Sequence, residues 1–311
     1  MRRWFRRAGA LVAVALIAYF AWFSYQSLDG RALASALSSP RAWLAMLAAT
    51  LAHMAVYPLT GSAWRRLLLR QGQDWRAGQL ARLVSLTQLA KYVPGNVLQH
   101  ASRAALALRA GMPVKPYAST VVQETLLACA ASILVGVPLL VDASAAMPAG
   151  YGPLLWSLFA GGVLLVLLLC MDVPPDAAAL SRTRLGRLLR VVGGLPGPRA
   201  TLAALLSYAL NYLLIGAGLW LIARALGMAE GVGFALAASA FALSWILGFL
   251  APGAPAGIGA REGIMILILQ GHAADAEVAQ FVLLARLASM SADLISFCLA
   301  AWWPRPAGSH I

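Results

Sequence analysis

The chain has 311 residues, of which 61% are hydrophobic and only 11% are charged. Its mean hydropathy of +0.77 excludes a water-soluble globular protein, because such a protein would need far more polar surface. The net charge of +13 could suggest nucleic-acid binding, but the arginines mostly lie between apolar runs, which is typical of membrane topology and of contact with anionic headgroups. We therefore expect a membrane protein with no nucleic-acid partner.

The first apolar run, at residues 8–25, follows four N-terminal arginines. It resembles a signal peptide, but it is long, rich in aromatic residues and lacks a small-residue cleavage site. We interpret it as a retained first span that also anchors the chain.

Six apolar runs are long enough to cross a membrane, since a span needs about 20 residues at a rise of about 1.5 Å each. They lie at about 8–25, 42–62, 118–141, 153–171, 201–223 and 279–302. Two further apolar stretches, at 79–110 and 232–270, are interrupted by Pro-Gly and by charges, so we expect each to form a broken or re-entrant helical hairpin. The predicted fold class is an all-α polytopic membrane protein.

The Lys/Arg bias of the loops predicts the orientation. The N-terminus and the arginine-rich loops around 65–76 and 182–199 should be cytoplasmic, whereas the loop at 142–152 has no Lys or Arg and the loop at 271–277 is weakly acidic. The first broken segment then enters and leaves from the cytoplasm, and the second enters and leaves from the periplasm. We expect a multi-pass protein of the bacterial inner (cytoplasmic) membrane with both termini cytoplasmic.

The two halves then have the same element order in opposite orientation, which predicts an inverted repeat within one transmembrane domain, 1–311. The first repeat would cover residues 1–145 and the second 150–303, each with one broken segment. Two unrelated kinked core helices are the alternative. The count, order and loop charges favour the repeat, although the letters of the sequence do not repeat.

The first broken segment places Lys91 and Tyr92 just before Pro94 and Gly95. Proline removes a backbone donor and glycine permits a sharp turn, so a helix should end here and restart. The N-terminus of the restarted helix favours an anionic group such as a phosphate, and Lys91 and Arg103 would add cationic contacts. The alternative is that both cations snorkel to the cytoplasmic headgroups.

The second broken segment has two prolines and four glycines within residues 252–263, around Arg261 and Glu262. Such a string cannot stay helical, so it must turn inside protein or beside water. Gly257 and Gly259 permit close backbone approach, and the apolar run that follows should return as a short helix. The alternative is a periplasmic loop followed by an interfacial helix.

Three ionisable residues lie in the spans that follow the two breaks, namely Glu124, Arg286 and Asp293. Such groups are costly in a membrane and usually face a partner, a cavity or a pathway. We expect Arg286 to reach Glu262 or Glu124, and Asp293 to reach an arginine or a hydroxyl. We favour a functional role for Glu124 and Arg286, and a buried structural ion pair for Asp293.

Both broken segments resemble the transmembrane region of the lysylphosphatidylglycerol synthases, a family also described as flippase-like domain proteins. The stretches that carry the resemblance are Gln88, residues 91–95 (KYVPG), Arg103 and residues 255–262 (PAGIGARE). The resemblance extends over nearly the whole chain in length and span order. It implies the translocating module without the soluble aminoacyl-transferring domain that larger members carry.

We therefore predict a flippase-like translocase of lipids or lipid-linked precursors that binds an anionic headgroup near the membrane midplane and is not an enzyme. The sequence has no P-loop, G-x-S-x-G or H-E-x-x-H motif and no paired metal-ligand spacing, so we expect no cofactor and no metal. The expected partners are an anionic phospholipid or lipid-linked headgroup and membrane lipids, and the sequence is compatible with a homo-oligomer. The predicted substrate-binding residues are Lys91, Tyr92, Pro94, Gly95, Arg103, Glu124, Gly257, Gly259, Arg261, Glu262 and Arg286.

Two alternatives stay open at this stage. One is a membrane-embedded lipid-modifying transferase with Glu124, Glu262 or Asp293 as its base, although no nucleotide-binding or metal motif supports it. The other is a non-transporting regulatory protein of envelope lipid metabolism, in which the charged breaks would be structural.

Overall fold

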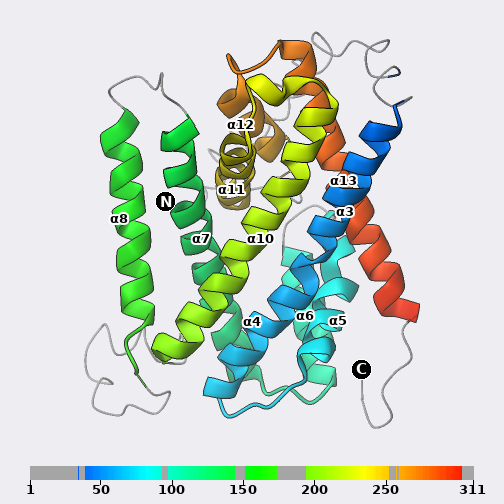
Figure 1. The fold of residues 1–311 in the computed structure, drawn as a ribbon. Helices are drawn as coiled ribbons and strands as arrows, with labels where there is room; N and C mark the ends of the chain where they lie inside the picture. The colour runs from blue at the N-terminus through cyan, green and yellow to red at the C-terminus, as the bar shows by residue number, and fades with distance from the viewer. Residues whose placement is uncertain are drawn as a thin grey trace, which may run out of the picture.

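The computed structural model describes residues 39–92, 97–143, 151–173, 194–251, 257 and 259–302, together with Ala34. Every named element in these ranges is a helix (Figure 1), which confirms the all-α class. The predicted span at 8–25 lies outside the described residues.

Five helical segments of the described residues are long and apolar enough to cross a membrane. They correspond to the remaining five predicted spans. They are Pro40–Arg70, which comprises α3 (Pro40–Met54) and α4 (Val56–Arg70), then α7 (Val114–Ala143), α8 (Tyr151–Leu169), α10 (Gly197–Ala225) and α13 (Asp275–Trp302).

The first of these segments is interrupted at Ala55, a break that the sequence interpretation did not include. Pro58 lies four residues after Met54, the last residue of α3. A proline ring clashes with the carbonyl group four residues earlier and offers no amide hydrogen to it, so the helix changes direction there.

The two stretches at 79–110 and 232–270 are each divided into short helices, as predicted. The first contains α5 (Ala77–Thr87), the 3-10 helix η1 (Gln88–Tyr92) and α6 (Val97–Arg109), and the second contains α11 (Phe234–Leu250) and α12 (Ala260–Leu269). Each of these short helices has fewer than the roughly 20 residues that a membrane span requires.

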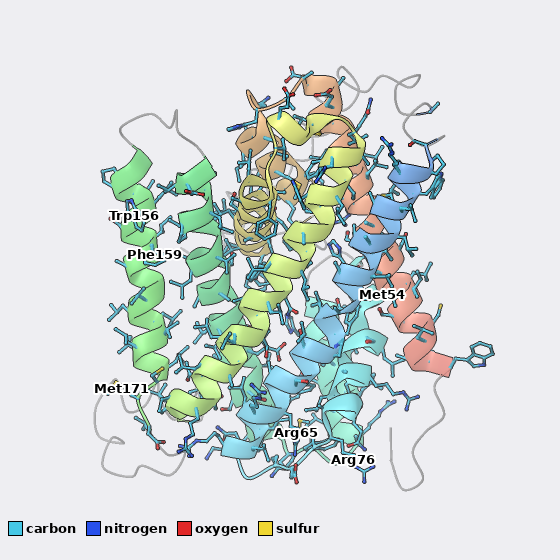
Figure 2. All side chains as sticks on the ribbon, in the orientation of Figure 1. Met54, Arg65, Arg76, Trp156, Phe159 and Met171 are labelled. Carbon is cyan, nitrogen blue, oxygen red and sulfur yellow. The ribbon has the colours of Figure 1, made fainter. Side chains whose placement is uncertain are left out.

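The two divided stretches lie in opposite halves of the molecule. In Figure 1, α5 and α6 lie in the lower half and α11 and α12 in the upper half. Figure 2 shows Arg65 and Arg76 together at the lower end, whereas Trp156 and Phe159 lie on the upper part of α8. The arrangement of six spans as an inverted repeat, with its boundaries, stays a prediction.

Small residues bring the helices close together around α10, which crosses the middle of the bundle (Figure 1). A Cβ atom added at Gly216 would lie 2.7 Å from the Ala238 Cα atom of α11, and one added at Gly218 would lie 2.7 Å from the Ala49 Cα atom of α3. Membrane helices associate through such close backbone approach, because lipid provides no hydrophobic driving force between them. This packing holds α3 and α11 against α10, and residues of all three helices line one cavity.

Candidate functional site

A cavity of about 790 Å³ lies where the two helix breaks meet. Its walls include η1 and α6 of the first broken segment and the end of α11 with Gly257 and Arg261 of the second. Residues of α3, α4, α5, α7, α10 and α13 also line it. The volume falls within the range of roughly 300–1,000 Å³ that is usual for small-molecule sites.

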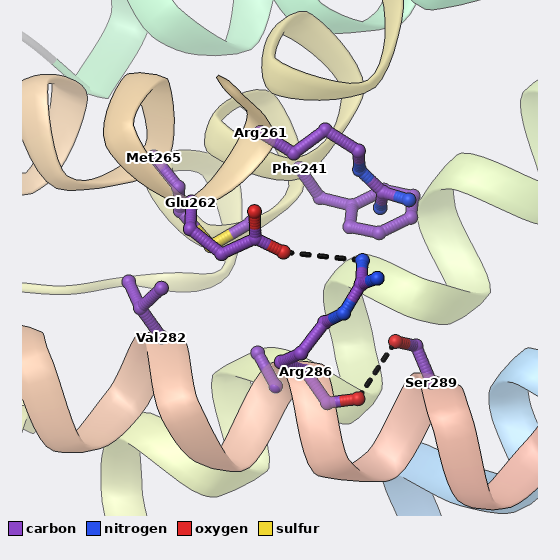
Figure 3. A pocket seen from close by; sticks show the side chains of 8 residues that line it. Phe241, Arg261, Glu262, Met265, Val282, Arg286 and Ser289 are labelled. Atoms are coloured by element: carbon purple, nitrogen blue, oxygen red, sulfur yellow. Dashed lines mark hydrogen bonds and ion pairs between the residues drawn. The ribbon is translucent and has the colours of Figure 1, made fainter. Parts of the chain in front are cut away.

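The structure brings most of the predicted site residues to this cavity. Lys91, Tyr92, Arg103, Glu124, Gly257, Arg261 and Arg286 line it. Glu262 lines a smaller cavity of about 20 Å³ that shares Arg261 and Arg286 with the large one (Figure 3). Gly259 precedes α12 at its N-cap, and Pro94 and Gly95 lie outside the described residues.

Asp293 of α13 binds three side chains from two other elements. Its Oδ1 atom accepts a hydrogen bond from the Tyr57 hydroxyl of α4, and its Oδ2 atom accepts one from the Tyr92 hydroxyl of η1. The Lys91 Nζ atom lies 2.7 Å from the same Oδ2 atom. Asp293 therefore reaches hydroxyls, as expected, and its lysine partner was not foreseen. This carboxylate joins η1 to α4 and α13, and Lys91 does not snorkel to the surface.

Arg103 of α6 forms a two-point ion pair with Glu124 of α7. The Nη1–Oε1 distance is 3.0 Å and the Nη2–Oε2 distance is 2.7 Å. The guanidinium carbon lies 3.8 Å from the centre of the Trp64 ring, and the Trp64 Nε1 atom donates to the Thr120 hydroxyl at 2.9 Å. Because Arg103 is only 5% exposed, it fixes α6 against α7 instead of snorkelling outward.

Arg286 of α13 reaches Glu262 of α12, one of the two partners expected for it, with an Nη1–Oε1 distance of 3.1 Å (Figure 3). The other carboxylate oxygen of Glu262 accepts a hydrogen bond from the Gly259 amide at 2.7 Å. A glutamate at the third helical position commonly binds the amide of the N-cap residue in this way. The Gly259 amide at the start of α12 is therefore already bonded within the protein.

Arg261 differs from the other cavity cations. Its guanidinium lies across the Phe241 ring, 5.0 Å from the ring centre (Figure 3). Among the described residues no carboxylate lies within ion-pair distance of it, and its Nε atom is buried without a hydrogen-bond partner. Arg261 therefore has an uncompensated positive charge that faces the cavity.

Two glycines make room for the Arg261 side chain. A Cβ atom at Gly248 would overlap the Arg261 Cγ atom, and one at Gly257 would lie 2.7 Å from its Cδ atom. Gly257 also has a φ angle of +68°, which side-chain-bearing residues rarely adopt. The predicted close approach at Gly257 is thus made by an arginine side chain, and Gly248 takes part although the sequence interpretation did not include it.

Aromatic residues of α10 and α11 form one wall of the cavity, and the sequence interpretation missed them. The Trp245 and Phe249 rings are stacked with centroids 5.5 Å apart and planes at 4°, and the Tyr212 ring lies 5.7 Å from Trp245. Aromatic residues in an apolar helix can equally face lipid or core, so the composition of α10 and α11 did not indicate that these residues line a cavity. Asp293 did have a signal in the sequence, since it is an acidic residue in a span.

Fold and site together define a polytopic helical protein with a charged, aromatic-walled internal cavity. The chain belongs to the family described as the lysylphosphatidylglycerol synthase TM region, whose model matches residues 10–295. A comparison with curated proteins finds no match. Family and apolar helices identify an integral, multi-pass membrane protein of lipid metabolism.

Proposed function

We propose that this protein translocates a lipid or lipid-linked precursor by binding its anionic headgroup in the cavity between the two helix breaks, without catalysing a reaction. The observation that carries the proposal is Arg261, a cation with no carboxylate partner among the described residues, in a cavity of about 790 Å³. An unpaired charge inside a membrane is costly, so a bound anion stabilises this arrangement.

The ion pairs around Arg261 support exchange of a headgroup. An anion bound at Arg261 also reaches Arg286 and competes there with Glu262, and both arginines line the cavity, while Lys91 stays paired with Asp293. When the headgroup leaves, Glu262 binds Arg286 fully again. Binding and release then occur without stranding a second bare charge in low dielectric.

The short helices support a pathway across the membrane. The two divided stretches lie in opposite halves of the molecule (Figure 1), and we place them as re-entrant hairpins entered from opposite sides. Transporters with inverted repeats bind substrate where such broken helices meet and expose the site to each side in turn. The acyl chains would remain in the bilayer while the headgroup crosses.

The experiment is leaflet exchange of fluorescent phosphatidylglycerol in reconstituted vesicles. We expect Arg261→Ala to slow exchange by about tenfold or more, because a charged contact to a buried anion is lost. Arg65→Ala is the matched control, since Arg65 is 44% exposed and pairs with Asp74 outside the cavity. All variants should elute as folded protein from gel filtration.

Exchange at the wild-type rate in an Arg261→Ala, Glu262→Ala double variant would overturn the proposal. So would protein-dependent formation of a modified lipid from a labelled donor without leaflet exchange, which would favour a transferase. Loss of folding in every Arg261 variant, Arg261→Lys included, would favour a structural role.

A further inference from the structure

The charges that line the cavity nearly cancel. Four cations, contributed by lysine and arginine, meet three carboxylates, and each carboxylate binds one cation. The pairs are Lys91 with Asp293, Arg103 with Glu124 and Arg286 with Glu262. The neighbouring residues 93–96 and 252–256 contain no ionisable side chain. Among the described residues, the site therefore has one positive charge in excess at pH 8, that of Arg261. The two histidines that also line the cavity, His53 and His100, are neutral at that pH.

Two unpartnered hydrogen-bond donors lie beside that excess charge. The Nε atom of Arg261 and the Nη2 atom of Arg286 are both buried and lack a partner among the described residues. Figure 3 shows the two guanidinium groups facing the same space, with Glu262 bound to only one of them. A phosphate with two free oxygens can accept from both donors, as paired arginine contacts to phosphate commonly do.

A second negative charge would have no cation available to it. To gain one, the ligand would have to displace Glu124, held at 2.7 and 3.0 Å, or Asp293, which also accepts two tyrosine hydroxyls. The small cavity next to Glu262 has about 20 Å³, so no further ionic group fits there. Such a volume holds about one water molecule.

We infer that the cavity selects a headgroup with a single negative charge, a phosphodiester, over phosphomonoesters and diphosphates, and that Arg261 neutralises this charge with Arg286 as second donor. The inference rests on the proposed function and specifies its substrate class. Specificity of this kind comes from the unpaired charge that the wrong ligand would leave in the site.

Two lipids that differ by one methyl group test the inference. Phosphatidylmethanol has one negative charge, whereas phosphatidic acid has about two at pH 8 and about one at pH 5. With identical fluorescent acyl chains, we expect phosphatidylmethanol to cross about tenfold faster at pH 8, because an uncompensated charge in the site is strongly disfavoured. At pH 5 the two rates should agree.

The Glu262→Gln variant removes one negative charge, so the excess positive charge of the cavity rises from one to two. Glutamine can still accept from the Gly259 amide, but Arg286 loses its counter-charge and the cavity gains a second excess cation. We expect phosphatidic acid at pH 8 to become the faster lipid. Equal rates of both lipids at pH 8 in the wild type, or an unchanged preference in Glu262→Gln, would overturn the inference while the proposed function stands. Absence of exchange for both lipids would overturn the two together.

Discussion

At the scale of single residues, the site depends on how each buried charge is compensated. Glu124, Asp293 and Glu262 each bind one cation, and Arg261 lies over an aromatic ring in place of a carboxylate. The sequence limited the expected partner of Arg286 to Glu262 or Glu124, because both are acidic residues within apolar segments, and the structure shows Glu262. The sequence could not specify that Lys91 binds Asp293, since their contact depends on how α13 is rotated.

Gly248 controls the position of the Arg261 side chain. In Gly248→Ala the new methyl group would overlap the Arg261 Cγ atom, so the guanidinium must leave its place over Phe241. We expect leaflet exchange to fall by about tenfold, with a loss of roughly 1–3 kcal/mol in unfolding free energy from overpacking. Gly161→Ala is the control, because nothing lies within 4 Å of its Cβ position. Equal exchange rates for the two variants would contradict this role of Gly248.

The Arg103–Glu124 pair should behave as a buried unit. In Glu124→Gln the guanidinium loses its counter-charge, and removing one partner of a buried pair costs about 3–5 kcal/mol. A double-mutant cycle with Arg103→Gln, followed by thermal unfolding in detergent, measures the coupling. We expect the double variant to be destabilised by less than the sum of the single variants. Strict additivity would mean that the pair is not coupled.

At the scale of helices, hydropathy was sufficient to predict where the chain crosses the membrane, but not where a helix changes type or which side of it faces a neighbour. Five of the six predicted spans and the two divided stretches are confirmed, since length and apolar content determine what can cross a membrane, and the sixth span, at 8–25, lies outside the described residues. Hydropathy did not predict the break at Ala55 or the 3-10 helix η1. A helix that is apolar on all sides gives no signal of which side faces a neighbour, so the aromatic wall of α10 and α11 could not be predicted either.

The crossing of α10 and α11 depends on Gly216. In Gly216→Ala the added methyl group would lie 2.7 Å from the Ala238 Cα atom, so the two backbones must separate. We expect a loss of roughly 1–3 kcal/mol in unfolding free energy, as for other overpacked sites, and a lower melting temperature in detergent. Gly161→Ala again serves as control, and a melting temperature for Gly216→Ala no lower than that of the control would show that the helices adjust freely.

At the scale of the whole molecule, the two divided stretches and the cavity form one system. Described residues next to both breaks line the same cavity, and the helices that carry them lie in opposite halves of the fold (Figure 1). Under the proposed function, two separate hairpins would allow the site to open toward one half while it stays closed toward the other. The proposal therefore depends on which side of the membrane each divided stretch enters.

Impermeant labelling of single cysteines determines those sides. In a background without the three native cysteines, Arg76→Cys and Arg109→Cys mark the two ends of the first divided stretch, and Phe234→Cys and Asp275→Cys mark the two ends of the second. All four positions are exposed at the ends of helices or next to them. We expect an impermeant maleimide to reach the first two only from the cytoplasmic side and the last two only from the periplasmic side, because arginine-rich loops stay in the cytoplasm. Labelling of positions 76 and 109 from opposite sides would mean that the first stretch spans the membrane, and a headgroup bound at Arg261 would then have no entry through two inverted hairpins.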